Sequence, residues 1–164
     1  PKLYFRLMVV KFKKRESVKE VEEGKVLQPK FDEKNLIPVI TVDKSNNEIL
    51  MHGYMNEEAF RLSMETKEAH YWSRSRKCIW RKGETSGLKQ KIQEISIDDD
   101  QDCVIFKVDL AGLKASCHVG YKSCFYRKLS SKNSKYIDQL EFTEKKKIFD
   151  PKDVYGDAPN PTKL

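Results

Sequence analysis

The feature of the sequence that most restricts its fold is a series of short apolar runs separated by polar turns. The stretch "FDEKNLIPVITVD" is rich in β-branched residues, and "NEILMHGYMN" follows around the polar turn "KSNN". Runs of this length, bounded by turn-forming residues, are typical of β-strands. The two stretches together predict a β-hairpin.

Further strands and one helix are predicted downstream. The segments "AHYWSRS", "KIQEISI" and "CVIFKVDL" have the composition of strands. Directly after the hairpin, Asn56 is placed to cap the stretch "EEAFRLSMETK", in which Phe60 and Met64 fall on one helical face. This order of elements predicts an α+β fold with a mainly antiparallel sheet and one clear short helix.

The length of 164 residues suits a single domain with tails. Residues 1–30 are dense in charge and are expected to form a solvated arm with a short strand or helix. The strand and helix patterns fall within residues 31–128, and residues 129–164 are a polar extension with an irregular end. The longest early apolar run, "LYFRLMVV", is too short for a signal sequence or a membrane span, so a cytoplasmic protein is expected.

The four cysteines are Cys78, Cys103, Cys117 and Cys124. Because no secretion signal is recognised, they are expected to be thiols or metal ligands rather than disulfides. The net charge of +7 favours anionic partners. Nucleic acid, membrane lipid and phosphorylated metabolites all meet that description, and charge alone does not choose among them.

The acidic stretch "DDDQD" places Asp98, Asp100 and Asp102 at alternate positions. On a straight strand these three would share one face at spacings of about 6 to 7 Å. In a curled turn all three could reach one Mg²⁺ ion. The alternative is a solvated acidic turn without a metal.

Three of the thiols and one histidine could form a zinc centre. Catalytic zinc sites commonly have three protein ligands and an open position, and Cys103, Cys117 and Cys124 could supply such a set. The sequence has no CxxC pair, which disfavours a structural zinc finger. The alternative is that these cysteines are small buried residues. His118, next to Cys117, could transfer protons at neutral pH or be merely structural.

The segment "HYWSRSRKCIWRKGETSG" combines basic residues with hydroxyls, glycines and aromatics. Guanidinium groups, hydroxyls and glycine backbone N–H groups suit phosphate oxygens. Basic residues interleaved with aromatics also describe a surface for nucleic acid. The candidates for phosphate binding are Arg74, Ser75, Arg76 and Lys82.

Taken in order, several stretches resemble the phosphoribosyl-AMP cyclohydrolase family of histidine biosynthesis. They are "LIPVI", "LMHGYMN", "HYWSRSR", "WRKGETSG", "DDDQD" and "CHVGYKSCF", spread over residues 32–128. The resemblance implies that residues 31–128 are a compact catalytic domain. It also implies a homodimer with zinc bound near the subunit interface and an aspartate-bound Mg²⁺ close by.

Carried over by this resemblance, Asp98, Asp100 and Asp102 are the Mg²⁺ ligands, and Cys117 and Cys124 are two of the zinc ligands. Many family members have a cysteine, the third zinc ligand, where this chain has Asp99. The substitute is expected to be Cys103, whose position has the same parity along the chain. Asp99 itself is the alternative third ligand, through oxygen.

The implied reaction is zinc-dependent hydrolysis of the N1–C6 bond in the adenine ring of 1-(5-phosphoribosyl)-AMP. Zinc would activate water for attack at C6, and His118 would transfer protons as the catalytic residue. The residues Arg74, Ser75, Arg76 and Lys82 would bind substrate phosphate. A small-molecule substrate and a second copy are the expected partners, without nucleic acid or membrane. The alternative is a non-catalytic or nucleic-acid-binding basic zinc protein derived from the same fold.

Overall fold

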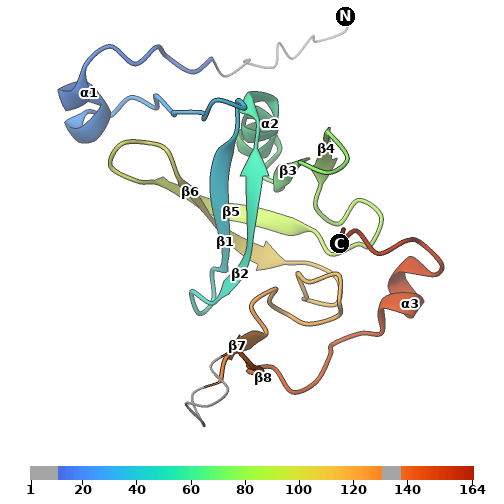
Figure 1. Ribbon diagram of the computed structural model, residues 1–164. Helices are drawn as coiled ribbons and strands as arrows, with labels where there is room; N and C mark the ends of the chain where they lie inside the picture. The colour runs from blue at the N-terminus through green and yellow to red at the C-terminus, as the bar shows by residue number, and fades with distance from the viewer. Residues whose placement is uncertain (1–10, 131–137) are drawn as a thin grey trace, which may run out of the picture.

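The computed structural model describes residues 11–130 and 138–164, which are arranged around a four-stranded sheet (Figure 1). The strand order is β2-β1-β6-β5. The pairs β1–β2 and β5–β6 are antiparallel, whereas β1 and β6 are parallel. The strands span Ile37–Asp43 (β1), Ile49–Met55 (β2), Gln90–Ile97 (β5) and Val104–Leu110 (β6). The predicted hairpin and the predicted α+β class with a mainly antiparallel sheet are confirmed, and the parallel pair is an addition.

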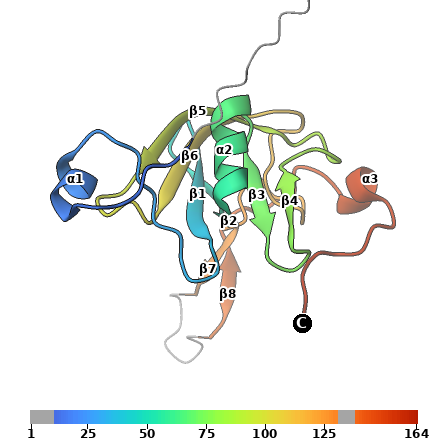
Figure 2. The ribbon, with the colours of Figure 1, turned by 90° about the horizontal axis from the view of Figure 1, so that it is seen from above.

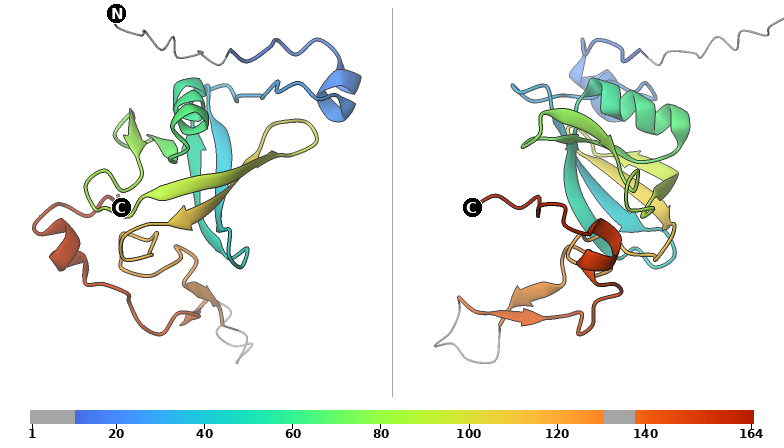
Figure 3. Two further views of the ribbon diagram at one scale, coloured as in Figure 1. Left: turned by 180° about the vertical axis from the view of Figure 1, so that it is seen from behind. Right: turned by 90° about the vertical axis from the view of Figure 1, so that its right-hand side faces the viewer.

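Two small strand pairs flank this sheet. His70–Ser73 (β3) pairs with Cys78–Arg81 (β4), and Arg127–Leu129 (β7) pairs with Leu140–Phe142 (β8), all antiparallel. The β3–β4 pair carries most of the basic segment. Figure 3 shows β7 and β8 projecting away from the main sheet.

The predicted helix is α2, Glu57–Thr66. The Asn56 side chain caps it by accepting a hydrogen bond from the Ala59 N–H at 2.8 Å. It packs against β2 and β3 on one face of the sheet, as seen from above in Figure 2. Phe60 on α2 and Tyr71 on β3 are fully buried there. Burial of such a side chain contributes about 1.5 to 3 kcal/mol, so this contact fixes β3 and the basic segment on the sheet.

There are two shorter helices: one lies in the N-terminal arm, where a short strand or helix was predicted, and the other lies in the C-terminal extension, where none was predicted. One, α1, spans Val18–Glu23, and the other, α3, spans Pro151–Tyr155. The stretch 138–164, expected to be irregular at its end, therefore contains β8 and α3. The apolar run "LYFRLMVV" lies outside the described residues. Within the described part of the chain, no helix is both long enough and apolar enough to cross a membrane.

Candidate functional site

The acidic stretch forms the turn between β5 and β6. The Asp98 carboxylate accepts hydrogen bonds from the backbone N–H groups of Asp102 at 2.9 Å and Cys103 at 3.0 Å. Gln101 has a φ of 59°, the left-handed conformation that allows the chain to reverse. The stretch is therefore curled rather than extended, as a shared cation requires.

The curl gathers the three predicted magnesium ligands. Asp98, Asp100 and Asp102 each offer a carboxylate oxygen within 4.8 Å of the other two. Burial and the neighbouring carboxylates of Asp98 and Asp100 raise the pKa of Asp102. Like charges at this spacing repel, and a divalent cation that prefers oxygen ligands relieves the repulsion. The donor set fits Mg²⁺.

Gln101 fastens this acidic turn to the N-terminal arm, a role that no sequence pattern indicated. Its Nε2 donates to the carbonyl oxygens of Val21 at 2.9 Å and Val26 at 3.2 Å, and its Oε1 accepts from the Gln28 N–H at 2.7 Å. The Gln101 side chain is buried. Residues 17–30 are therefore docked on the turn rather than free in solvent, and Figure 1 shows α1 beside it.

Cys117 and Cys124 come together through a tight loop, residues 116–124, called here the thiol loop. The Ser116 N–H donates to the Lys122 carbonyl at 2.8 Å, and the Cys117 N–H donates to the Tyr121 carbonyl at 3.1 Å. The two thiol side chains are hydrogen-bonded to each other. The fold thus unites two of the three predicted zinc ligands.

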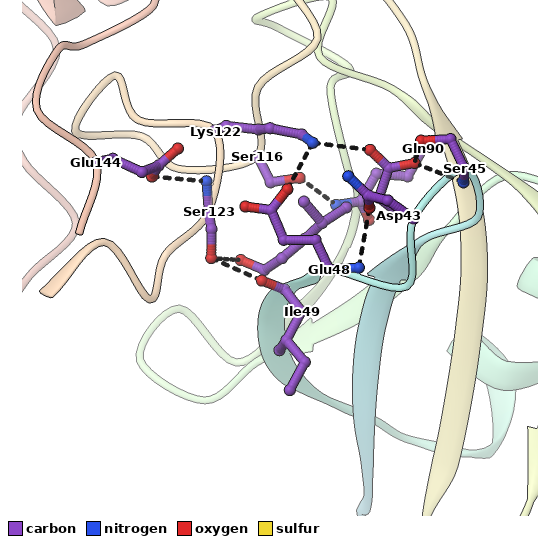
Figure 4. Close-up of polar contacts among 11 residues, drawn as sticks. Asp43, Ser45, Glu48, Ile49, Gln90, Ser116, Lys122, Ser123 and Glu144 are labelled. Carbon is purple, nitrogen blue, oxygen red and sulfur yellow. Dashed lines mark hydrogen bonds and ion pairs between the residues drawn. The ribbon is translucent and has the colours of Figure 1, made fainter. Parts of the chain in front are cut away.

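Figure 4 shows how the thiol loop is anchored to the β1–β2 hairpin. The Lys122 ammonium lies 3.0 Å from Asp43 and 2.6 Å from Glu48. The Ser123 hydroxyl donates to the Ile49 carbonyl at 2.7 Å. These contacts fix the thiol loop over the edge strand β2.

The paired thiols are electrostatically unequal. The hydrogen bond from Cys124, helped by the Val119 backbone and the Lys82 ammonium, lowers the pKa of Cys117 to about 6. The same hydrogen bond raises the pKa of Cys124. One thiolate is therefore held at neutral pH, and the thiolate is the form of cysteine that binds zinc.

Lys82, predicted to bind phosphate, lies beneath the thiol loop. Its Nζ donates to the Ser116 carbonyl at 2.7 Å, its exposed fraction is only 8%, and burial lowers its pKa. The Ser116 hydroxyl in turn accepts from Gln90 Nε2 at 3.1 Å, and Gln90 Oε1 accepts from the Tyr71 hydroxyl at 2.6 Å. This buried network joins the thiol loop to the core. Gln90 and Tyr71 lie in ordinary strand patterns, so no sequence motif indicated their role.

A cavity of about 500 Å³ connects the thiol loop with the basic segment. His118 and Cys124 line it together with Ser75, Arg76 and Lys82. Its volume lies in the usual range for small-molecule sites. Three of the four predicted phosphate-binding residues therefore share one space with the predicted catalytic histidine.

Arg74 is not among the residues that line this cavity. Its guanidinium carbon lies 4.3 Å from the centre of the Tyr54 ring, on β2. The neighbouring Arg76 donates from Nε to the Ser73 hydroxyl at 3.3 Å. The Arg74 side chain thus lies against Tyr54, whereas the Arg76 side chain lies at the cavity. Arg74 is therefore separated from the other predicted phosphate ligands.

His118 has the features of a proton carrier. Its Nε2 is buried and has no hydrogen-bond partner in the described part of the chain. Burial, and next the nearby Lys82 charge, lower its pKa. The imidazole is therefore neutral at neutral pH and can accept a proton. A buried nitrogen left without a protein partner suits a ligand or bound water.

Cys103 lies apart from the thiol loop. It precedes Val104, the first residue of β6, whereas the Cys124 N–H donates to Leu50 on β2 at 2.7 Å. Strand β1 separates β2 from β6, which corresponds to about 10 Å across the sheet. Leu50 lies next to the row of Phe106, about 10 Å along β6 from Cys103. Within the described residues of one chain, this cysteine does not join the thiol pair.

Comparisons with known proteins relate this chain to one enzyme family. Residues 51–126 match the family model of phosphoribosyl-AMP cyclohydrolase. A phosphoribosyl-AMP cyclohydrolase of Sinorhizobium fredii is 44% identical over 138 residues, which cover 84% of this chain and 90% of that protein. The protein of the same name from Brucella suis is 51% identical over 117 residues, or 71% of this chain and 84% of its own.

Proposed function

Since the chain belongs to the phosphoribosyl-AMP cyclohydrolase family, we infer that it is a hydrolase of histidine biosynthesis that opens the adenine ring of phosphoribosyl-AMP. The observation that carries this inference is the shared cavity. It brings His118 and the Cys124 thiol within one space lined by Ser75 and Arg76. A ring to be hydrolysed and a phosphate to be held can occupy such a cavity together.

We propose that Cys117 and Cys124 bind a catalytic Zn²⁺. The adjacent thiols, one of them held as thiolate, fit the soft ligand set that zinc prefers. A third protein ligand is needed, and Cys103 of a second copy of the chain is the proposed source. Asp99, which lies in the same turn as Cys103, is the alternative.

The proposed homodimer is supported by apolar side chains near the thiol loop. Phe125 directly follows Cys124 and is 56% exposed, and Phe142 on β8 is 55% exposed. Leu129 on β7 and Leu140 on β8 are also more than half exposed. Exposed apolar groups gathered in this way favour contact with another chain. A second copy seated here could bring its acidic turn, with Cys103, to the thiol pair.

The second proposed cofactor is Mg²⁺, bound by Asp98, Asp100 and Asp102. The carboxylate oxygens are gathered within one chain, at a spacing that one ion can span. Cys103 directly follows the acidic turn and precedes Val104, the first residue of β6. A dimer that places Cys103 at the thiol pair therefore places this magnesium site beside the zinc site.

The chain's own residues supply binding and proton transfer. Zinc bound to the thiolates would supply a water of lowered pKa for attack at C6. His118, neutral at neutral pH, is proposed to take up a proton and return it to N1 as the N1–C6 bond breaks. Ser75 and Arg76 would hold a substrate phosphate. Lys82, already engaged with Ser116, is better suited to stabilising the Cys117 thiolate than to contacting phosphate.

The cytoplasm is the proposed location, and the four cysteines, all of which are free thiols in the structure, fit its reducing conditions. The proposed function is tested by an absorbance assay of phosphoribosyl-AMP ring opening together with metal analysis of the purified chain. Cys124→Ser is expected to lose both turnover and zinc. Cys78→Ser is the matched control, because Cys78 is an exposed thiol on β4 outside the cavity.

A wild-type chain without turnover would contradict the proposed function. Salt-sensitive binding of nucleic acid in its place would favour the alternative of a nucleic-acid-binding zinc protein. Full turnover in Cys124→Ser would remove the catalytic role proposed for zinc while leaving the ring-opening activity in place.

A further inference from the structure

The segment after α3, residues 156–164, lies at the cavity. Pro159, Asn160, Pro161 and Lys163 are among the residues that line it. Figures 1 and 3 show this red segment running from α3 back toward the turn that follows β4. None of the sequence motifs includes these residues, and the sequence predicted only an irregular polar end.

The packing of α3 determines where this segment begins. Phe149, just before the helix, is 8% exposed and packs with the buried Leu88 and Ala115. Val154 and Tyr155 of α3 pack against the same cluster. The helix is therefore held on the body of the protein, and the segment leaves from a fixed position.

Contacts within the segment direct it toward the thiol loop. The Asn160 side-chain oxygen accepts a hydrogen bond from the Thr162 N–H at 2.8 Å, which forms a local turn. The Asn160 side chain also has a hydrogen bond with the His118 ring. The segment thus contacts the residue proposed to transfer protons.

The cavity is lined by four basic side chains and one carboxylate, that of the exposed Glu84, and two of the basic side chains form no ion pair in the described part of the chain. Arg81 is paired with Glu68 at 3.4 Å, and Lys82 is engaged with a backbone carbonyl. Arg76 and Lys163 form no ion pair with any residue in ranges 11–130 and 138–164. A phosphoribosyl group attached to AMP gives a molecule with two phosphate groups. Two anionic groups held in one cavity call for two available cations.

We propose that residues 156–164 form one wall of the substrate site, in which Lys163 binds one substrate phosphate and Arg76 binds the other. This proposal rests on the proposed function, because it takes phosphoribosyl-AMP as the substrate. It assigns Lys163 to binding rather than to chemistry. The contact is present equally in the ground state and the transition state.

Steady-state kinetics of the full chain test the role of Lys163. Lys163→Ala is expected to raise KM for phosphoribosyl-AMP about tenfold with kcat unchanged, the pattern of a lost binding contact. Lys163→Arg should keep KM near the wild-type value, because the charge is retained. Lys152→Ala is the matched control, since Lys152 is an exposed lysine on α3 outside the cavity.

Removal of residues 157–164 tests the whole wall and is expected to raise KM more than Lys163→Ala does. Wild-type KM in both Lys163→Ala and the shortened chain would overturn the proposal while the proposed function stands. If the wild type shows no turnover, the proposed function fails. In that case phosphoribosyl-AMP is not consumed, and calorimetric titration measures its affinity for Lys163→Ala and for the control Lys152→Ala. Weaker binding by Lys163→Ala is expected, and equal affinities of the two variants would overturn the proposal.

Discussion

The acidic turn and the thiol loop are built in opposite ways, although both are proposed to bind metal ions. The acidic turn takes its three carboxylates from five consecutive positions, 98–102, and one chain completes the group. The thiol loop brings together only two cysteines, and the third predicted ligand, Cys103, lies just before β6, away from that loop. The proposed site for a hard cation is thus local in sequence, whereas the proposed zinc site depends on a second copy of the chain.

The two regions also differ in what supports them. Gln101 ties the acidic turn to the N-terminal arm through buried hydrogen bonds. The thiol loop rests on the β1–β2 hairpin through Lys122 and Ser123, and on the core through Gln90. Metal binding by the acidic turn should therefore respond to changes in the arm. Zinc binding should respond to the partner chain and to the core network through Gln90.

The largest expected effect on turnover comes from two cysteine variants that are inactive alone and restore activity when they form a heterodimer. Cys103→Ser and Cys117→Ser are each expected to lose turnover by roughly 1000-fold, as for removal of a catalytic group. When the two variants are co-expressed with different tags, about a quarter of wild-type activity should return. Half of a random mixture is heterodimer, and each heterodimer has one intact thiol site out of two. The measurement is turnover of the purified heterodimer and of the mixture.

The acidic turn should behave in the opposite way. Co-expression of Asp100→Asn with Asp102→Asn cannot rebuild a turn, because both ligands belong to the same chain. Activity recovered in the aspartate pair, or none recovered in the cysteine pair, would contradict the contrast between the two regions. If Cys103→Ser stays active while Asp99→Asn does not, the third zinc ligand is Asp99.

The support of the acidic turn is tested next. Gln101→Ala should lower the free energy of unfolding by about 3 kcal/mol, because buried partners such as the Gln28 N–H and the Val21 carbonyl are left unsatisfied. Gln93→Ala is the matched control, as Gln93 is an exposed glutamine on β5. Urea unfolding followed by circular dichroism measures both variants. Equal stability of the two would show that the N-terminal arm does not hold the turn.

Much of the fold could be predicted, because its main strands and its longest helix are determined by residues close together in the sequence. The alternation of residues in β1, β2, β5 and β6 and the Asn56 cap of α2 depend on neighbours in sequence. The parallel pairing of β1 with β6 was not predictable in this way. It depends on how the connection through α2 packs, which is a tertiary property.

The candidate site follows the same rule. The curl of the acidic turn could be predicted, because a polar run without apolar residues between two strands favours a turn, and only a turn lets the three aspartates share one cation. The burial of Lys82 beneath Ser116 and the position of Arg74 over Tyr54 could not. Both depend on which face of β3 and β4 meets the sheet. The role proposed for Lys163 was even less predictable from the sequence, because only the packing of α3 brings that residue to the cavity.

The effect of Mg²⁺ on stability tests which carboxylates of the acidic turn bind the ion. Mg²⁺ at about 100 times its dissociation constant should stabilise the wild-type chain by about 2.7 kcal/mol. Asp100→Asn should lose most of this effect, because one of three gathered carboxylates is neutralised. Asp99→Asn, the neighbouring aspartate outside the group, should keep it. Thermal unfolding with and without Mg²⁺ measures the difference, and an equal loss in both variants would contradict the assignment.

The anchor of the thiol loop gives the smallest expected effect. The Lys122 side chain is 25% exposed, so its ion pairs with Asp43 and Glu48 are partly screened by solvent. Lys122→Ala should therefore cost only about 1 kcal/mol of stability. Ser123 still holds the loop on β2, so the zinc content should stay unchanged. Lys44→Ala, an exposed lysine beside the same hairpin turn, is the matched control. Loss of zinc from Lys122→Ala would show that the hairpin, rather than the core network through Gln90, positions the thiol pair.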